Sequence, residues 1–162
     1  MKEFLTKPVT QDEGRSLSQF MTYFGASLDP MVWVNLIEEE ANEVLKAFSN
    51  EGPEQHLKEL ADLRYVIVGF TLVRPSLLEA LVSQEGIDKL SYVDKLMGAV
   101  HEMLDASSAR YTDAQLSEAF ALVHTSNMSK LGEDGKPVRR ADGKIMKGPH
   151  YKAPDLSLLV AA

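Results

Sequence analysis

Two stretches of sequence decide the fold: LIEEEANEVLKAF at residues 36–48 and LKELADLRYVIVGF at residues 57–70. In each stretch, apolar residues recur every three or four positions, which is the period of an amphipathic helix. Asp29-Pro30 and Gly52-Pro53 precede these stretches and place proline in a first helical turn, where its missing N–H is tolerated. We therefore expect helices over residues 30–49 and 53–73.

Helical periodicity also covers most of the remaining chain up to about residue 128. It predicts further helices over residues 11–26, 88–106 and 112–128, with a short helix over 75–84. After Lys130 the pattern changes to two Asp-Gly steps, Asp134-Gly135 and Asp142-Gly143, which favour tight turns. The prediction is one all-α domain over 1–162. It has a bundle of about five helices at residues 10–128 and an irregular, basic C-terminal extension, a loop or small hairpin, at 129–162.

Composition narrows the class of protein. The chain has 162 residues, 44% of them hydrophobic and 25% charged, which suits one soluble domain of ordinary size. Since it contains no cysteine, disulfides, thiol catalysis and cysteine metal sites are excluded. We find neither an apolar run of about 18 residues nor the features of a secretory leader, so we expect a cytoplasmic protein with no membrane partner.

Charge is divided unevenly along the chain. The net charge is -7, which argues against a nucleic acid polymer as partner. Residues 127–152, however, carry seven basic and three acidic side chains. An acidic helical body therefore precedes a basic, glycine-punctuated tail.

Acidic residues interrupt the apolar faces of the two central helices. At about 100° per residue, Glu40 and Glu43 lie on the flank of the apolar stripe of the first helix, with Glu39 slightly further round. On the next helix, Glu59 and Asp62 share an arc with apolar residues. If a tight turn near residue 51 makes these helices an antiparallel hairpin, Glu43 faces Glu59 and Glu40 faces Asp62.

Such a seam of carboxylates requires neutralisation. Like charges withdrawn from water are costly unless protons or cations compensate them. An all-oxygen ligand set favours Mg²⁺ or Mn²⁺, and several carboxylates can hold two or more such ions. A ferritin-like di-iron site would need Glu-x-x-His motifs, which this chain lacks. One Glu-rich helix alone is usually a solvated face, but the second acidic cluster on an apolar face favours a metal site.

The spacing Glu39-Glu40-x-x-Glu43, then Glu59-x-x-Asp62, resembles the EExxE...ExxD signature of the all-α nucleoside triphosphate pyrophosphohydrolase superfamily. That superfamily includes MazG-type enzymes, dimeric dUTPases and phosphoribosyl-ATP pyrophosphohydrolases. The resemblance covers residues 31–73 well and the other helices more loosely. The tail, with Asn127-Met128-Ser129-Lys130 and the run from Lys147 to Pro154, is most similar to small stand-alone MazG-like proteins.

The resemblance implies Mg²⁺-dependent cleavage of a nucleoside triphosphate between its α and β phosphates, as a house-cleaning activity on the nucleotide pool. It also implies that Glu39, Glu40, Glu43, Glu59 and Asp62 bind the metal ions, and that the protein is a homodimer or homotetramer. We take Glu40 as the candidate that orients or deprotonates the attacking water, because its flank position reaches both the seam and the metals. Glu39 beside it is the other candidate catalytic carboxylate.

The basic tail supplies candidate substrate-binding residues. Lys130, Lys144 and Lys147 are candidates for binding phosphates, Asn127 for hydrogen bonding to a base or sugar, and Tyr151 for stacking on a base. The alternative is a solvated surface loop.

Two other functions stay open. One is phosphoribosyl-ATP hydrolysis in histidine synthesis, which the long tail fits less well. The other is a non-enzymatic helical oligomerisation module whose acids form a salt-bridged seam. Mg²⁺-dependent thermal stabilisation would distinguish a metal enzyme from such a module.

Overall fold

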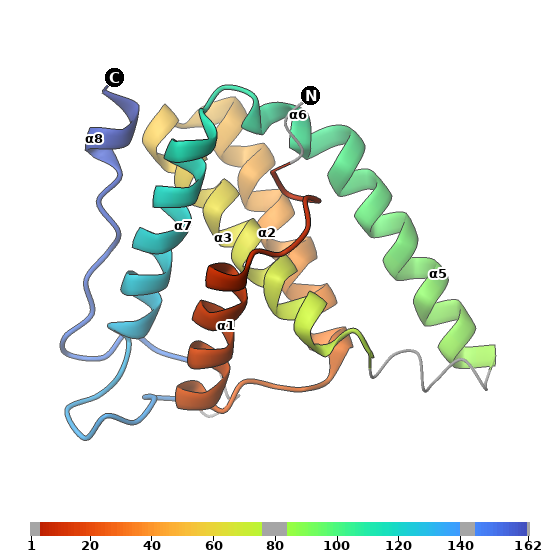
Figure 1. Ribbon diagram of the computed structural model, residues 1–162, viewed down its shortest axis with the longest axis horizontal. Helices are drawn as coiled ribbons and strands as arrows, with labels where there is room; N and C mark the ends of the chain where they lie inside the picture. Colours follow the sequence, from red (N-terminus) through yellow and green to blue (C-terminus); the bar gives the residue numbers. More distant parts are fainter. Residues whose placement is uncertain (1–3, 76–83, 140–144, 162) are drawn as a thin grey trace.

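The computed structural model describes residues 4–75, 84–139 and 145–161, and helices dominate it (Figure 1). The all-α architecture predicted from the sequence is confirmed. In chain order the elements are α1 (Gln11–Phe24), α2 (Pro30–Asn50), α3 (Pro53–Val73), α5 (Gln84–Ala99), a π-helical turn (Val100–Leu104), α6 (Asp105–Ser108), α7 (Asp113–Met128) and α8 (Ser157–Val160).

The helices begin where the local chemistry favours it. Thr10 and Thr112 each accept a hydrogen bond from a backbone N–H three residues later and complete capping boxes at α1 and α7. Asp29 caps α2 by accepting from the Met31 N–H. Helix α1 ends at Phe24, two residues earlier than predicted, because Gly25 adopts a left-handed conformation with φ 54°.

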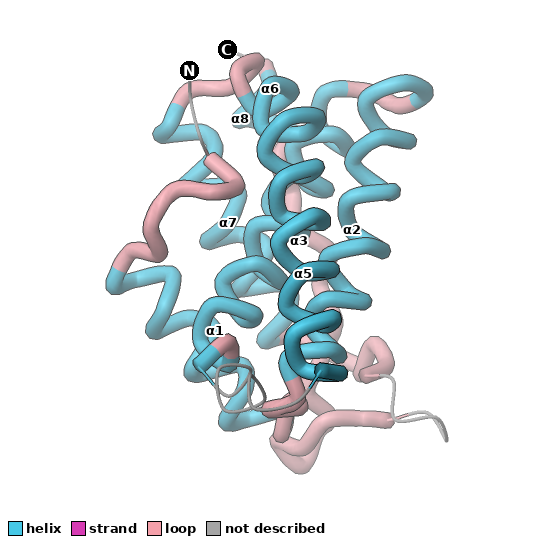
Figure 2. Tube along the Cα trace, turned by 90° about the vertical axis from the view of Figure 1, so that its right-hand side faces the viewer, coloured by secondary structure: helices cyan, strands magenta, loops and turns pink. Residues whose placement is uncertain are grey.

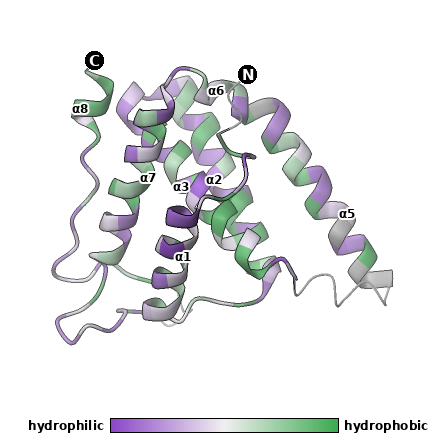
Figure 3. Cartoon of the chain, viewed as in Figure 1, coloured by the Kyte–Doolittle hydropathy of each residue, from purple (hydrophilic) through white to green (hydrophobic). Residues whose placement is uncertain are grey.

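Helix α3 forms the centre of the bundle. It packs against α2, α7, α1 and α8, and most of its side chains from His56 to Val73 are buried. Figure 3 shows hydrophobic residues concentrated toward its C-terminal end. Helix α5 lies along one side of the bundle and diverges from it toward Gln84 (Figures 1 and 2).

Close packing joins α2 to α3 about two helical turns from Glu40 and Asp62. A Cβ atom at Gly69 would lie 2.0 Å from Cζ3 of Trp33, so only glycine lets this indole lie against α3. The indole N–H of Trp33 donates to the Ser27 carbonyl at 2.8 Å. Trp33 is consequently fixed, with 3% of its surface exposed.

A buried ion pair fastens the N-terminal segment. Arg64 of α3, with 0% exposure, donates to both carboxylate oxygens of Glu13 at 2.9 Å and to the Leu5 and Lys7 carbonyls. Burial alone would raise the pKa of Glu13, but hydrogen bonds from Arg64 and from the Thr10 N–H outweigh burial and lower it. Since every donor and acceptor has a partner, the charge pair is tolerated inside the protein.

The helix that precedes α7 differs from the prediction in where it begins and ends. The expected helix over residues 88–106 begins at Gln84 and passes through the π-helical turn before ending as α6. Most of the predicted short helix over 75–84 lies outside the described residues. Among the residues that the structure describes, no helix is both long enough and apolar enough to cross a membrane.

The described part of the tail packs against α7. Residues 131–139 form a small irregular loop with an isolated bridge between Leu131 and Pro137, and Arg139 forms a second bridge with Ile145. The chain then runs beside α7 (Figure 1), where Ser126 Oγ donates to the Lys152 carbonyl at 2.7 Å. Leu156, 1% exposed, buries the end of this segment before α8.

Candidate metal and nucleotide site

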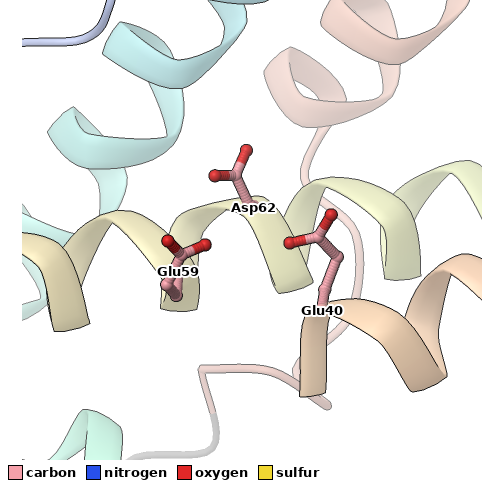
Figure 4. Close-up of side chains that lie close together, drawn as sticks. All are labelled: Glu40, Glu59 and Asp62. Carbon is pink, nitrogen blue, oxygen red and sulfur yellow. The ribbon is translucent and has the colours of Figure 1, made fainter. Parts of the chain in front are cut away.

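Three carboxylates meet between α2 and α3. Glu40, Glu59 and Asp62 each place an oxygen atom within 4.8 Å of the others. Figure 4 shows Glu40 extending from α2 toward Asp62, while Glu59 lies one helical turn away on α3. We call these three residues the acidic cluster. The cluster brings Glu40 together with acids that lie 19 and 22 positions later in the sequence, because α2 and α3 pack as an antiparallel pair.

Burial makes the acidic cluster electrostatically unfavourable on its own. Withdrawal from water, followed by the charges of Asp62 and Glu59, raises the pKa of Glu40 from 4.5 to about 8. Burial likewise raises the pKa of Glu59, although Lys58 opposes this effect. Ionised together, these groups require positive charge beside them.

Lys58 supplies part of that charge. Its ammonium lies 2.7 Å from Asp62 Oδ2 and 3.1 Å from Glu59 Oε1. Burial alone would lower the pKa of Lys58, but the charges of Asp62 and Glu59 outweigh it and raise the pKa above its ordinary value. Lys58 is not among the site residues predicted from the sequence. Its position four residues before Asp62 on one helix is a pairing signal that was available.

Glu39 and Glu43 lie at the edge of the same site. Both are exposed, and Glu43, with 47% of its side chain accessible, pairs with Lys46 at 3.5 Å. Neither belongs to the acidic cluster, yet both line the cavity into which it opens.

That cavity, which we call the acidic cavity, has a volume of about 410 Å³ and is walled by α2, α3, α7 and the tail. It brings together all the candidate site residues that the structure describes: Glu39, Glu40, Glu43, Glu59, Asp62, Asn127, Lys130, Lys147 and Tyr151. Lys144 lies outside the described residues. Carboxylates therefore form one wall and lysines the other, an arrangement that matches cations bound to a polyanion.

The polar residues of the tail side are held by neighbours. Lys130 donates to Asn127 Oδ1 at 2.7 Å, and the ammonium of Lys147 lies 4.6 Å from the ring centroid of Tyr151. Burial lowers the pKa of Lys130. Burial raises the pKa of Tyr65, and the amide of Asn127 opposes this effect.

Tyr65 connects this wall to two other helices. Its hydroxyl lies 2.9 Å from Nδ1 of His124, whose Nε2 lies 3.2 Å from Oε1 of Gln19 on α1. The amide oxygen of Gln19 can only accept, so His124 carries its proton on Nε2 and Tyr65 donates to Nδ1. The contacts from Gln19 through His124 thus fix the orientation of the Tyr65 hydroxyl.

A second cavity, which we call the aromatic cavity, adjoins the first and has a volume of about 440 Å³. Glu39, Glu40, Asp62, Asn127 and Lys130 line both cavities. The remaining walls are largely apolar, and the rings come from Phe20, Trp33 and Tyr65. This cavity is not predictable from local sequence patterns, because its walls come from segments between residues 20 and 145.

The fold and the site define a class: an all-α bundle whose central helix pair carries an acidic cluster facing a basic wall. Residues 20–75, about a third of the chain, match the family model of phosphoribosyl-ATP pyrophosphohydrolase. No curated protein and no solved structure matches the chain. The matched segment contains α2, α3 and both acidic motifs. The resemblance to the all-α nucleoside triphosphate pyrophosphohydrolase superfamily is thereby confirmed, and it indicates a nucleotide pyrophosphohydrolase.

Proposed function

We propose that the protein cleaves a nucleoside triphosphate between its α and β phosphates in a divalent-metal-dependent reaction, releasing the monophosphate and pyrophosphate. The supporting observation is the acidic cavity, where the acidic cluster faces Lys130 and Lys147 across about 410 Å³. A polyphosphate carrying divalent cations matches both walls at once. Its biological role would be the removal of unwanted nucleotides from the cellular pool.

The donor set fits a hard divalent cation. Glu40, Glu59 and Asp62 offer carboxylate oxygens within 4.8 Å of one another, and Mg²⁺ and Mn²⁺ prefer oxygen ligands. With Glu39 and Glu43 at the rim, we propose room for two or more ions. When bound, such ions neutralise phosphate charge and lower the pKa of the attacking water.

The chain's own residues would then act by position and charge. Glu40, with Glu39 beside it, would orient or deprotonate the water. Lys130 and Lys147 would bind phosphate oxygens. Tyr151 lines the acidic cavity and not the aromatic one, so it would stack on a base only where the nucleoside lies beside its phosphates. Asn127 lies where the two cavities meet, within reach of a sugar. Lys144 remains a candidate on sequence alone.

The aromatic cavity is the natural place for the nucleoside. Its rings offer faces for a base, and its volume of about 440 Å³ falls within the size range of small-molecule pockets. Because the cavity adjoins the acidic cluster through Asp62 and Glu40, a nucleoside bound there would direct its phosphates toward the carboxylates.

Phosphoribosyl-ATP is the second candidate substrate, because the family model that matches residues 20–75 carries its name. It is cleaved at the same α–β bond. The two substrates differ in the ribosyl phosphate on the base, so the aromatic cavity would have to admit an additional charged group.

We further propose that the protein is a homodimer or homotetramer. Toward its C-terminal end, α2 exposes Leu45 and Phe48 to 41–42% of their surface, and such apolar exposure is typical of subunit contacts. Light scattering during size-exclusion chromatography would measure the assembly directly.

The function is tested by incubating the protein and Mg²⁺ with a panel of nucleoside triphosphates and with phosphoribosyl-ATP. We expect pyrophosphate and a monophosphate product from at least one of them. Glu59→Gln should reduce kcat at least a hundredfold, whereas Glu38→Gln, an exposed position on α2, should leave it unchanged. Orthophosphate as the only product would refute α–β cleavage. The absence of all turnover and of any metal-dependent stabilisation would favour the oligomerisation module.

A further inference from the structure

The ammonium of Lys58 sits on the oxygens that a divalent cation would use. It lies 2.7 Å from Asp62 and donates to both oxygens of Glu59, at 3.1 and 3.2 Å. Two of the three members of the acidic cluster are therefore already paired with a cation belonging to the protein.

Lys58 and a bound metal ion cannot share these oxygens at ordinary ligand distances without strong repulsion between their positive charges. The Lys58 side chain is 30% exposed and has a flexible four-carbon stem, so it can leave without unfolding α3. Glu59 keeps a hydrogen bond from Gln55 when Lys58 departs.

From this geometry we propose that Lys58 is a tethered cation: it holds the acidic cluster together before metal binds, then turns to the phosphates of the substrate. The inference rests on the proposed function. It assigns Lys58 two successive partners within one cavity, carboxylates first and polyphosphate second.

The cavity supports the second partner. Lys58 lines the same 410 Å³ space as Lys130 and Lys147. Those two lysines have other contacts, with Asn127 and with the ring of Tyr151, rather than with the acidic cluster. A displaced Lys58 would bring a third positive charge to the phosphates, from the wall that carries the metal ligands.

The test separates metal binding from phosphate binding. Mn²⁺ affinity is measured by electron paramagnetic resonance on chelator-treated protein without nucleotide. Affinity for a non-hydrolysable imido analogue of inorganic triphosphate, which needs no base recognition, is measured by calorimetry at saturating Mn²⁺. Lys58→Gln is compared with wild type, with Lys58→Arg, and with Lys95→Gln, an exposed position on α5. Lys58→Met serves as a second neutral variant if Lys58→Gln folds poorly.

Lys58→Gln should bind Mn²⁺ about tenfold more tightly, because a competing cation is removed, and the triphosphate analogue about tenfold more weakly. Lys58→Arg should stay closer to wild type in both affinities, and Lys95→Gln should have the same two affinities as wild type. A merely structural role would weaken both affinities, and that result would overturn the proposal. So would unchanged Mn²⁺ affinity, or unchanged triphosphate affinity. Failure of the wild-type protein to bind Mn²⁺ at all would instead overturn the proposed function.

Discussion

Replacing Glu40 by glutamine should stabilise the metal-free protein at alkaline pH. Glutamine has the same shape as glutamate but carries no charge. The substitution therefore removes one of the three negative charges that repel one another in the acidic cluster. A carboxyl whose pKa is raised on folding contributes stability below its unfolded pKa, and this contribution is lost as the pH rises through the folded value. For Glu40, this stabilising contribution is lost as the pH rises from 4.5 to about 8, the pKa values in the unfolded and folded protein.

The size of the effect follows from these two pKa values. A pKa raised from 4.5 to about 8 corresponds to about 5 kcal/mol of lost stability once Glu40 is fully ionised. Movement of Lys58 and of water toward the charge reduces this, so we expect about 3 kcal/mol at pH 9. For a domain of this size, that is a rise in Tm of about 6–12 °C in Glu40→Gln. At pH 5 the two proteins should differ little.

The assay is thermal unfolding across pH 5–9, first with chelator and then with Mg²⁺. Wild type should gain about 3 kcal/mol at a Mg²⁺ concentration one hundred times its Kd, and Glu40→Gln should gain almost nothing. Glu38→Gln, on the exposed side of α2, is the matched control and should retain the full Mg²⁺ response. If Glu40→Gln is less stable than wild type at pH 9 without metal, or keeps the Mg²⁺ response, the reasoning about the acidic cluster is wrong.

Three further substitutions test the surrounding structure. Arg64→Met should leave Glu13 buried without its partner and reduce the free energy of unfolding by about 3–5 kcal/mol, measured by urea denaturation; a loss below 1 kcal/mol would contradict the buried pair. Gly69→Ala should displace Trp33 and reduce stability by about 1–3 kcal/mol, with a shift in tryptophan fluorescence, and an unchanged spectrum would count against the close approach. Tyr65→Phe should raise the KM for nucleotide about threefold to tenfold without changing Mn²⁺ affinity; equal effects on both would show that it acts on the whole fold.

The helix pair was predictable because the sequence features that specify each helix lie within the helix itself and extend over many residues. About six turns of apolar periodicity in each helix, with Pro30 and Pro53 at the starts, leave few alternatives to two helices joined by a short turn. The position of the connection between the two helices then determines which acidic residues face each other. Residue spacing alone therefore predicts that Glu40 lies near Asp62, a pairing that the acidic cluster contains.

Other features depend on side-chain conformations or on distant segments, which periodicity does not encode. The apolar periodicity of α3 cannot show that the Lys58 ammonium pairs with Asp62 instead of extending into water. From the sequence, Arg64 is expected to be a solvent-exposed charge on a helix. Its burial depends on the N-terminal segment, which covers it only in the folded protein. The aromatic cavity needs Phe20, Trp33 and the tail together, so it emerges only in the assembled fold.

The division of the site into two adjoining cavities has an evolutionary consequence. The acidic cluster stands on α2 and α3, while much of the aromatic cavity is built by residues 20–36 and by the tail. Under the proposed function, exchanges among the residues that line only the aromatic cavity would alter which base is accepted and leave the acidic cluster intact. Relatives of this chain would then acquire new substrates through such exchanges, with the reaction itself unchanged.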